Sequence, residues 1–193
     1  LISCYVGLIV LILFNLIFSG SVILTPPLAA LSTMLLIPFL SLGYSGGKAD
    51  MEFGMPPSEF VAERKLNFRF IGKSLIIGAV SGLVAAGCFA LNSANYSNGI
   101  SCALASYFFC IAAFAVLGQS DDLPFRTMKN ASFTAKAGLS AALLAPILLC
   151  YIPFVNTSFG LYPISFLALI VSVLTGVFPA IVYYFFKRFI KIR

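Results

Sequence analysis

PISFLALIVSVLTGVFPAIVYYFF, residues 163–186, contains no charged side chain and runs directly into the basic tail KRFIKIR, residues 187–193. A helix that crosses a membrane needs about 20 mainly apolar residues, because each residue adds about 1.5 Å across roughly 30 Å of hydrocarbon. Positive residues gather at the cytoplasmic ends of such helices. The stretch therefore predicts a transmembrane helix that ends on the cytoplasmic side.

The composition of the whole chain agrees with this interpretation. Hydrophobic residues make up 61% of the 193 residues and charged residues only 9%, with a mean hydropathy of +1.05. A soluble domain carries about 25% charged residues. Lipid is therefore the expected surrounding of most of the chain, and we expect no nucleic-acid partner. The sequence has no His, which excludes a histidine proton relay or a histidine metal site.

Apolar runs of similar length recur along the chain and predict an all-α membrane protein, a single domain over 1–193. The six predicted spans cover about 1–19, 26–44, 70–91, 100–118, 134–153 and 163–186. Pro26-Pro27 suits the first turn of a helix, because proline fixes φ and lacks an N–H that would be unpaired there. Residues 92–99 and 153–163 read as loops, since they are rich in turn-forming residues or bracketed by proline.

The charges predict the orientation of this six-helix bundle. All twelve Lys and Arg fall within 48–73, 126–136 and 187–193, while the alternate loops have none. Four of the six acids lie within 48–73, and the other two, Asp121 and Asp122, lie just before 126–136. Because positive residues mark the cytoplasmic side, we expect both termini to be cytoplasmic.

Within the spans, two patterns bear on helix packing. Small residues recur every fourth position in the third span, at Ser74, Gly78, Gly82, Ala86 and Ala90. Such stripes let helix backbones approach closely, so we interpret this one as a packing face. Prolines interrupt three helices, at positions 38, 146 and 179, and each leaves a backbone carbonyl without its donor. Broken helices often build ion sites in transporters, but we interpret positions 146 and 179 as packing kinks.

The sequence offers few groups for chemistry. It has no phosphate-binding loop, nucleophile elbow or metal-ligand cluster. The five cysteines show no CxxC spacing, and a disulfide on the outer side or burial as small apolar residues are both open. Asp121-Asp122 could hold a divalent ion, although adjacent acids at a helix end are more often solvated.

The start of the chain resembles a known family. The segment 1–57 resembles the fifth and sixth membrane helices of P-type ATPases and the loop that follows them. The shared features are Pro38 within the second span, Leu42-Gly43-Tyr44 at its exit, then Asp50, Met51 or Met55, and Pro56-Pro57. Downstream, Gln119-Ser120-Asp121-Asp122-Leu123 with Arg126-Thr127 looks like the end of the eighth helix. The last hairpin and basic tail are similar to helices nine and ten.

The resemblance implies a transport region beside Pro38. In ion-pumping members, polar and acidic side chains on helices five and six coordinate the ion. The matching positions here are Tyr5, Leu8, Leu31, Met34 and Leu35. None is a good ligand for a hard cation, which requires oxygen donors. The transport candidates that remain are Asn15, Ser32, Thr33, Pro38, Gln119, Asp121 and Asp122.

The resemblance further implies that this chain is the C-terminal membrane part of an ATP-driven cation translocase. ATP and Mg²⁺ would bind domains absent from this sequence, so the chain alone would not be catalytic. Because it begins at Leu1 within an apolar run, we expect a piece of a longer protein whose partners are the bilayer and the remaining pump domains. One alternative is a non-transporting helical module, either a degenerate pump or a scaffold. Another is an unrelated small channel or carrier, which the lack of charge within the spans disfavours.

Overall fold

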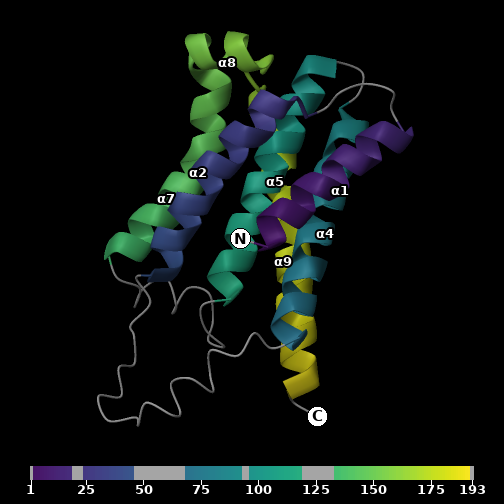
Figure 1. Cartoon of the computed structure of the whole chain (residues 1–193), viewed down its shortest axis with the longest axis vertical. Helices are drawn as coiled ribbons and strands as arrows, with labels where there is room; N and C mark the ends of the chain where they lie inside the picture. The colour runs from purple at the N-terminus through teal and green to yellow at the C-terminus, as the bar shows by residue number, and fades with distance from the viewer. Residues whose placement is uncertain (1, 19–23, 46–67, 93–95, 119–132, 192–193) are drawn as a thin grey trace.

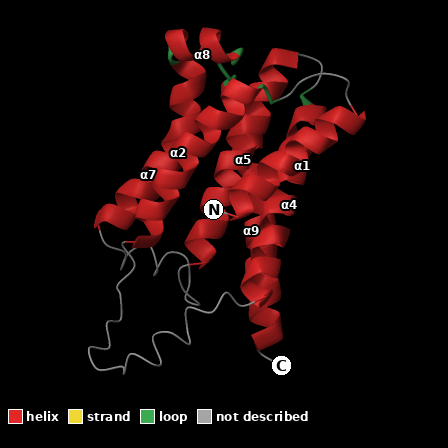
Figure 2. Cartoon of the chain, viewed as in Figure 1, coloured by secondary structure: helices red, strands yellow, loops and turns green. Residues whose placement is uncertain are grey.

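The computed structural model describes residues 2–18, 24–45, 68–92, 96–118 and 133–191. Within these ranges the regular structure is entirely helical (Figure 2). The helices are α1 (Ile2–Phe18), α2 (Pro26–Ser45), α4 (Phe68–Leu91), α5 (Tyr96–Gly118), α7 (Phe133–Tyr151), α8 (Pro153–Phe159) and α9 (Phe166–Lys191).

The six long helices confirm the predicted helical membrane bundle. Four of them contain stretches long and apolar enough to cross a membrane, which are Ile71–Leu91, Asn98–Leu117, Phe133–Tyr151 and Phe166–Phe186. The described parts of α1 and α2 are shorter apolar helices. Successive long helices run in alternating directions along the bundle (Figure 1). The chain is therefore a multi-pass integral membrane protein.

Helix α5 forms the centre of the bundle. It packs against α4, α7 and α9, while α1 lies on α4 and α2 lies on α7 (Figure 1). Every residue from 99 to 112 is buried. Small Ala, Ser and Cys side chains in this stretch let several neighbours approach at once. By contrast, α1 and α2 have few contacts with each other.

The middle of the small-residue stripe on α4, at Gly78 and Gly82, packs closely against α1, as predicted, whereas Ala90 at its end is exposed. A Cβ atom built on Gly82 would lie 2.5 Å from the carbonyl oxygen of Gly7 on α1. One built on Gly78 would lie 2.6 Å from the carbonyl oxygen of Ser3. The backbones of α1 and α4 therefore approach as closely as glycine allows.

The region between α7 and α9 differs from the predicted loop at 153–163. Residues Pro153–Phe159 form the short helix α8, with proline at its start. The helix ends at Gly160, whose φ of 67° is the left-handed conformation that glycine adopts without strain. The sequence prediction was wrong here because proline was read as ending one helix and not as beginning another.

Candidate transport site

One of the predicted transport positions, Leu8, lies where α1, the beginning of α2 and α5 meet, and this place is apolar. A cavity of about 10 Å³ lies between these helices. Its lining consists of Leu8, Leu11, Leu24, Leu28, Ile100, Ala103, Leu104 and Tyr107. A buried water needs roughly 10–15 Å³ and two or more polar partners. The leucines therefore fill this centre and leave no room for a hydrated ion.

The five positions that match the family's ion ligands do not converge on one point. Leu8 is buried, whereas Tyr5 is half exposed and the side chain of Met34 is 75% exposed. Leu31 and Leu35 are partly buried against the main core. Two of the five side chains thus face away from the interior of the described bundle.

Two of the polar candidates of α1 and α2, Ser32 and Thr33, form hydrogen bonds within their own helix. The hydroxyl of buried Ser32 donates to the carbonyl of Leu28 at 2.7 Å, and that of Thr33 donates to the carbonyl of Ala30 at 2.8 Å. Both bonds stay within α2. Asn15 is buried in the last part of α1, where it takes part in an interaction.

Pro38 lies within α2 and is exposed. Because it lacks an N–H, the carbonyl of Met34 loses its usual helical donor. The hydroxyl of Ser41 donates to the carbonyl of Pro38 itself at 2.8 Å. The remaining candidates, Gln119, Asp121 and Asp122, lie outside the described residues.

Among the described residues, no buried polar side chain is left without a partner that a hard cation could replace. Every buried side-chain nitrogen or oxygen among them has a hydrogen-bond partner. The same residues contain no group of three or more His, Cys, Asp or Glu side chains that could hold a metal ion. The part of the chain that the structure describes does not by itself fit a hard cation.

Sequence reasoning missed the polar contacts that join the helices. The hydroxyl of Tyr107, fully buried on α5, donates to the carbonyl of Cys4 on α1 at 2.5 Å. Near the start of α5, the hydroxyl of Ser101 accepts from the backbone N–H of Tyr162 at 2.9 Å. The only sequence signal for these contacts is a polar atom within an apolar run, which does not identify its partner.

All five cysteines are buried and free, so the disulfide considered from the sequence is absent. Cys88, Cys102 and Cys150, from three different helices, share one apolar cluster. The thiol of Cys88 lies 3.8 Å from the hydroxyl of Ser172 on α9. These cysteines act as small core residues, which is the commoner role of buried cysteine.

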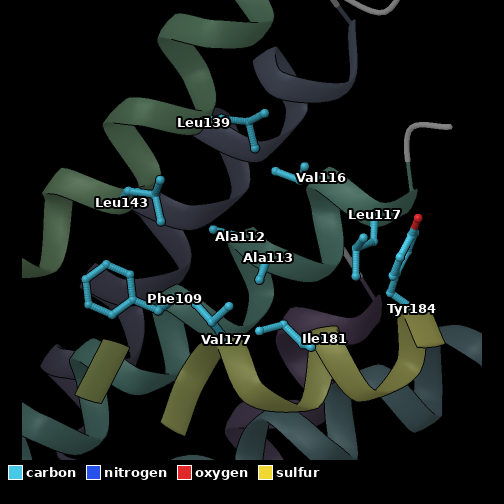
Figure 3. A pocket seen from close by; sticks show the side chains of 10 residues that line it. All are labelled: Phe109, Ala112, Ala113, Val116, Leu117, Leu139, Leu143, Val177, Ile181 and Tyr184. Carbon is cyan, nitrogen blue, oxygen red and sulfur yellow. The ribbon is translucent and has the colours of Figure 1, made fainter. Parts of the chain in front are cut away.

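A larger cavity of about 280 Å³ lies between α5, α7 and α9 (Figure 3). Side chains of Phe109, Val116, Leu139, Leu143, Val177 and Ile181 contribute to its lining, and the ring of Tyr184 stands at one end. This lining is apolar apart from that phenol. The cavity can accept hydrocarbon but provides no ligand set for a cation.

Comparison with known proteins identifies the family. The model described as "Cation transporting ATPase, C-terminus" matches residues 33–189, which reach from α2 to α9. No curated protein and no solved structure matches the chain. The match covers most of the chain and agrees with its helical membrane architecture. The chain therefore belongs to the cation-transporting P-type ATPases, of which it is the C-terminal transmembrane region.

Proposed function

We propose that this chain is the C-terminal membrane part of an ATP-driven cation transporter and works with the ATP-hydrolysing domains of the same pump. The observation that carries the proposal is the family match over residues 33–189. In this arrangement the phosphorylated domains outside the sequence drive the conformational cycle, while the helices described above form part of the path of the ion. ATP and Mg²⁺ bind those other domains.

The proposal must account for the apolar centre between α1, α2 and α5. A hard cation requires several oxygen ligands. On α2, the carbonyl of Met34, freed by Pro38, and the hydroxyls of Ser32 and Thr33 supply oxygen atoms. Further ligands must come from Gln119, Asp121 or Asp122 and from membrane helices that precede this sequence. The chain contributes a fraction of the ion site and not a complete one.

Orientation is also part of the proposal. Both termini and the segment 45–69 lie on the cytoplasmic side, as the distribution of Lys and Arg indicates. The segment 45–69 then faces the phosphorylation domain and couples it to the end of α2.

A second candidate function is a non-transporting membrane module, either a degenerate pump or a scaffold. The apolar residues at the ligand positions, Leu8, Leu31 and Leu35, favour it. Such a module keeps the helix packing of the family without moving an ion.

The first experiment measures the size of the native product with an antibody raised against residues 45–69. A band several times larger than 20.7 kDa supports the pump. The larger protein, once purified, should incorporate phosphate from ATP in response to one cation. A band near 20.7 kDa, or a large protein that is never phosphorylated, contradicts transport and favours the non-transporting module.

A further inference from the structure

The connection between α7 and α9 has the properties of a segment that lies in lipid. We call residues 151–167, which include α8, the α8 segment. It lies at the opposite end of the bundle from the C-terminus (Figure 1). The chain carries no charged residue between Lys136 and Lys187, so the α8 segment and the parts of α7 and α9 that adjoin it are uncharged.

The backbone of the α8 segment is largely paired within the protein. The N–H groups of Val155 and Asn156 donate to the carbonyl of Ile152 at 3.1 and 2.9 Å. The carbonyl of Asn156 accepts from Gly160 and Leu161. Prolines at 153 and 163 have no N–H to satisfy. A loop in water does not need such pairing, whereas a segment in lipid does, because lipid offers no partner.

The polar side chains of the segment are also paired internally. The hydroxyls of Thr157 and Ser158 donate to carbonyls one turn earlier at 2.9 and 2.8 Å. The hydroxyl of Tyr151 donates to the carbonyl of Ile164 across the base of the hairpin. The amide of Asn156 donates to the carbonyl of Cys150 at 3.4 Å. These bonds lower the cost of placing the polar groups at low dielectric.

The outer surface of the segment is aromatic and aliphatic. The exposed large side chains are Tyr151, Ile152, Phe154, Tyr162, Phe166 and Leu167. Phe154 is 80% exposed, and no residue of α8 is buried. Val155 and Phe159 are partly buried against the main core, so one side of α8 rests on the bundle while the side that carries Phe154 is exposed. Tyrosine and other amphipathic rings concentrate where the headgroups of a bilayer meet its acyl chains.

We propose that the α8 segment is embedded in the headgroup–acyl boundary of the bilayer and that its binding partner is lipid. Phe154, Phe166 and Leu167 insert among the upper acyl carbons, while the ring hydroxyl of Tyr162 lies toward the headgroups. The segment thereby fixes the depth of the bundle at the end away from its basic tail. This inference rests on membrane insertion alone and does not depend on transport.

The chain contains no Trp, so one introduced Trp reports its own depth. We would reconstitute Phe154→Trp in phosphatidylcholine vesicles whose acyl chains carry bromine near the headgroup or near the bilayer centre. We expect a larger loss of emission with the shallow bromines than with the deep ones, and little loss with iodide in the water. The control is Leu174→Trp, an exposed position two turns into α9, where the deep bromines should quench more strongly.

Each other outcome overturns the proposal. Strong quenching by iodide with none by brominated lipid would place α8 in water. Quenching by neither would mean that a polypeptide covers it. If Phe154→Trp fails to fold, the same quenching measurement can be made on Phe166→Trp, at a second exposed position of the α8 segment.

Glycosylation gives an independent readout. Asn156-Thr157-Ser158 is an N-glycosylation acceptor sequence within α8. A sequon in the lipid boundary should remain unmodified when the chain is made in a cell that glycosylates secreted proteins. A glycan on Asn156 would overturn the proposal, because it requires an aqueous α8.

Discussion

The hydroxyl of Tyr107 donates a 2.5 Å hydrogen bond to the backbone carbonyl of Cys4, which joins the middle of α5 to the first turn of α1. Cys4 and Leu8 lie on the same face of α1 and are both buried. The bond thus fixes the rotation of α1 about its axis beside the predicted transport region.

Replacing Tyr107 by Phe should destabilise the bundle by about 1 kcal/mol, the usual net value of one buried hydrogen bond. The ring remains in place, so the loss isolates the hydroxyl. Thermal unfolding in a mild detergent measures the change. Tyr5→Phe, at a half-exposed position on α1, is the control and should unfold close to the original temperature. Equal shifts for the two variants would show that the bond to Cys4 contributes nothing.

Substituting Gly82 by Ala should destabilise the contact between α1 and α4 by about 1–3 kcal/mol, as overpacking does. The added methyl group would lie 2.5 Å from a backbone oxygen of Gly7, which cannot move without moving the whole of α1. Gly87→Ala, on the same helix, is the matched control because its new methyl group meets nothing within 4 Å. Unfolding of both variants in detergent tests the difference. A Gly82→Ala protein as stable as Gly87→Ala would contradict the close approach of the two helices.

Filling the large cavity should be tolerated. Ala112→Leu adds carbon atoms toward the space of about 280 Å³ between α5, α7 and α9, so its stability should change by less than about 1 kcal/mol. Ala103→Leu adds the same atoms beside a cavity of about 10 Å³ and should cost about 1–3 kcal/mol or more. Both alanines are buried, and both lie in the interior of α5. The difference in helix propensity between Ala and Leu is therefore the same for the two substitutions. If Ala112→Leu is the more damaging variant, the cavity is not an available space.

Replacing Pro38 by Ala in the complete pump should slow the turnover of the phosphorylated intermediate while leaving the protein folded. The substitution restores an N–H that can pair with the carbonyl of Met34 and so removes a free oxygen and a break in α2. Pro38 is exposed, so little packing is lost. Dephosphorylation after a chase with unlabelled ATP measures turnover.

Pro146→Ala provides the contrast for that experiment. Pro146 is fully buried in α7, so its replacement should lower stability more than Pro38→Ala does. Unchanged phosphoenzyme turnover in Pro38→Ala would remove any role of Pro38 in the cycle.

The sequence predicted the long helices well because length and apolarity alone decide them. The span predicted over 100–118 corresponds to α5, and that predicted over 134–153 to α7. It could not predict that α5 is central. Helices that are apolar on all sides show no preferred buried face, so the periodicity of the sequence does not tell which helix lies at the centre of the bundle.

The candidate site was predicted less well for a related reason. The resemblance identified Pro38 and the apolar substitutions at Leu8 and Leu31, and the structure places Leu8 beside a small apolar cavity. It did not identify Tyr107, whose role depends on a carbonyl of a helix more than one hundred residues earlier. Such a contact follows from the arrangement of helices and not from local spacing.

The separate support of α1 and α2 has a mechanical consequence. Because α1 rests on α4 and α2 rests on α7, the boundary between α1 and α2 is a seam that few contacts close. Widening this seam breaks few interactions, whereas sliding either helix off its own support breaks many. The bundle therefore consists of two well-packed helix pairs, α1 with α4 and α2 with α7, which are joined through α5. A force applied at the end of α2 should first move these two pairs apart.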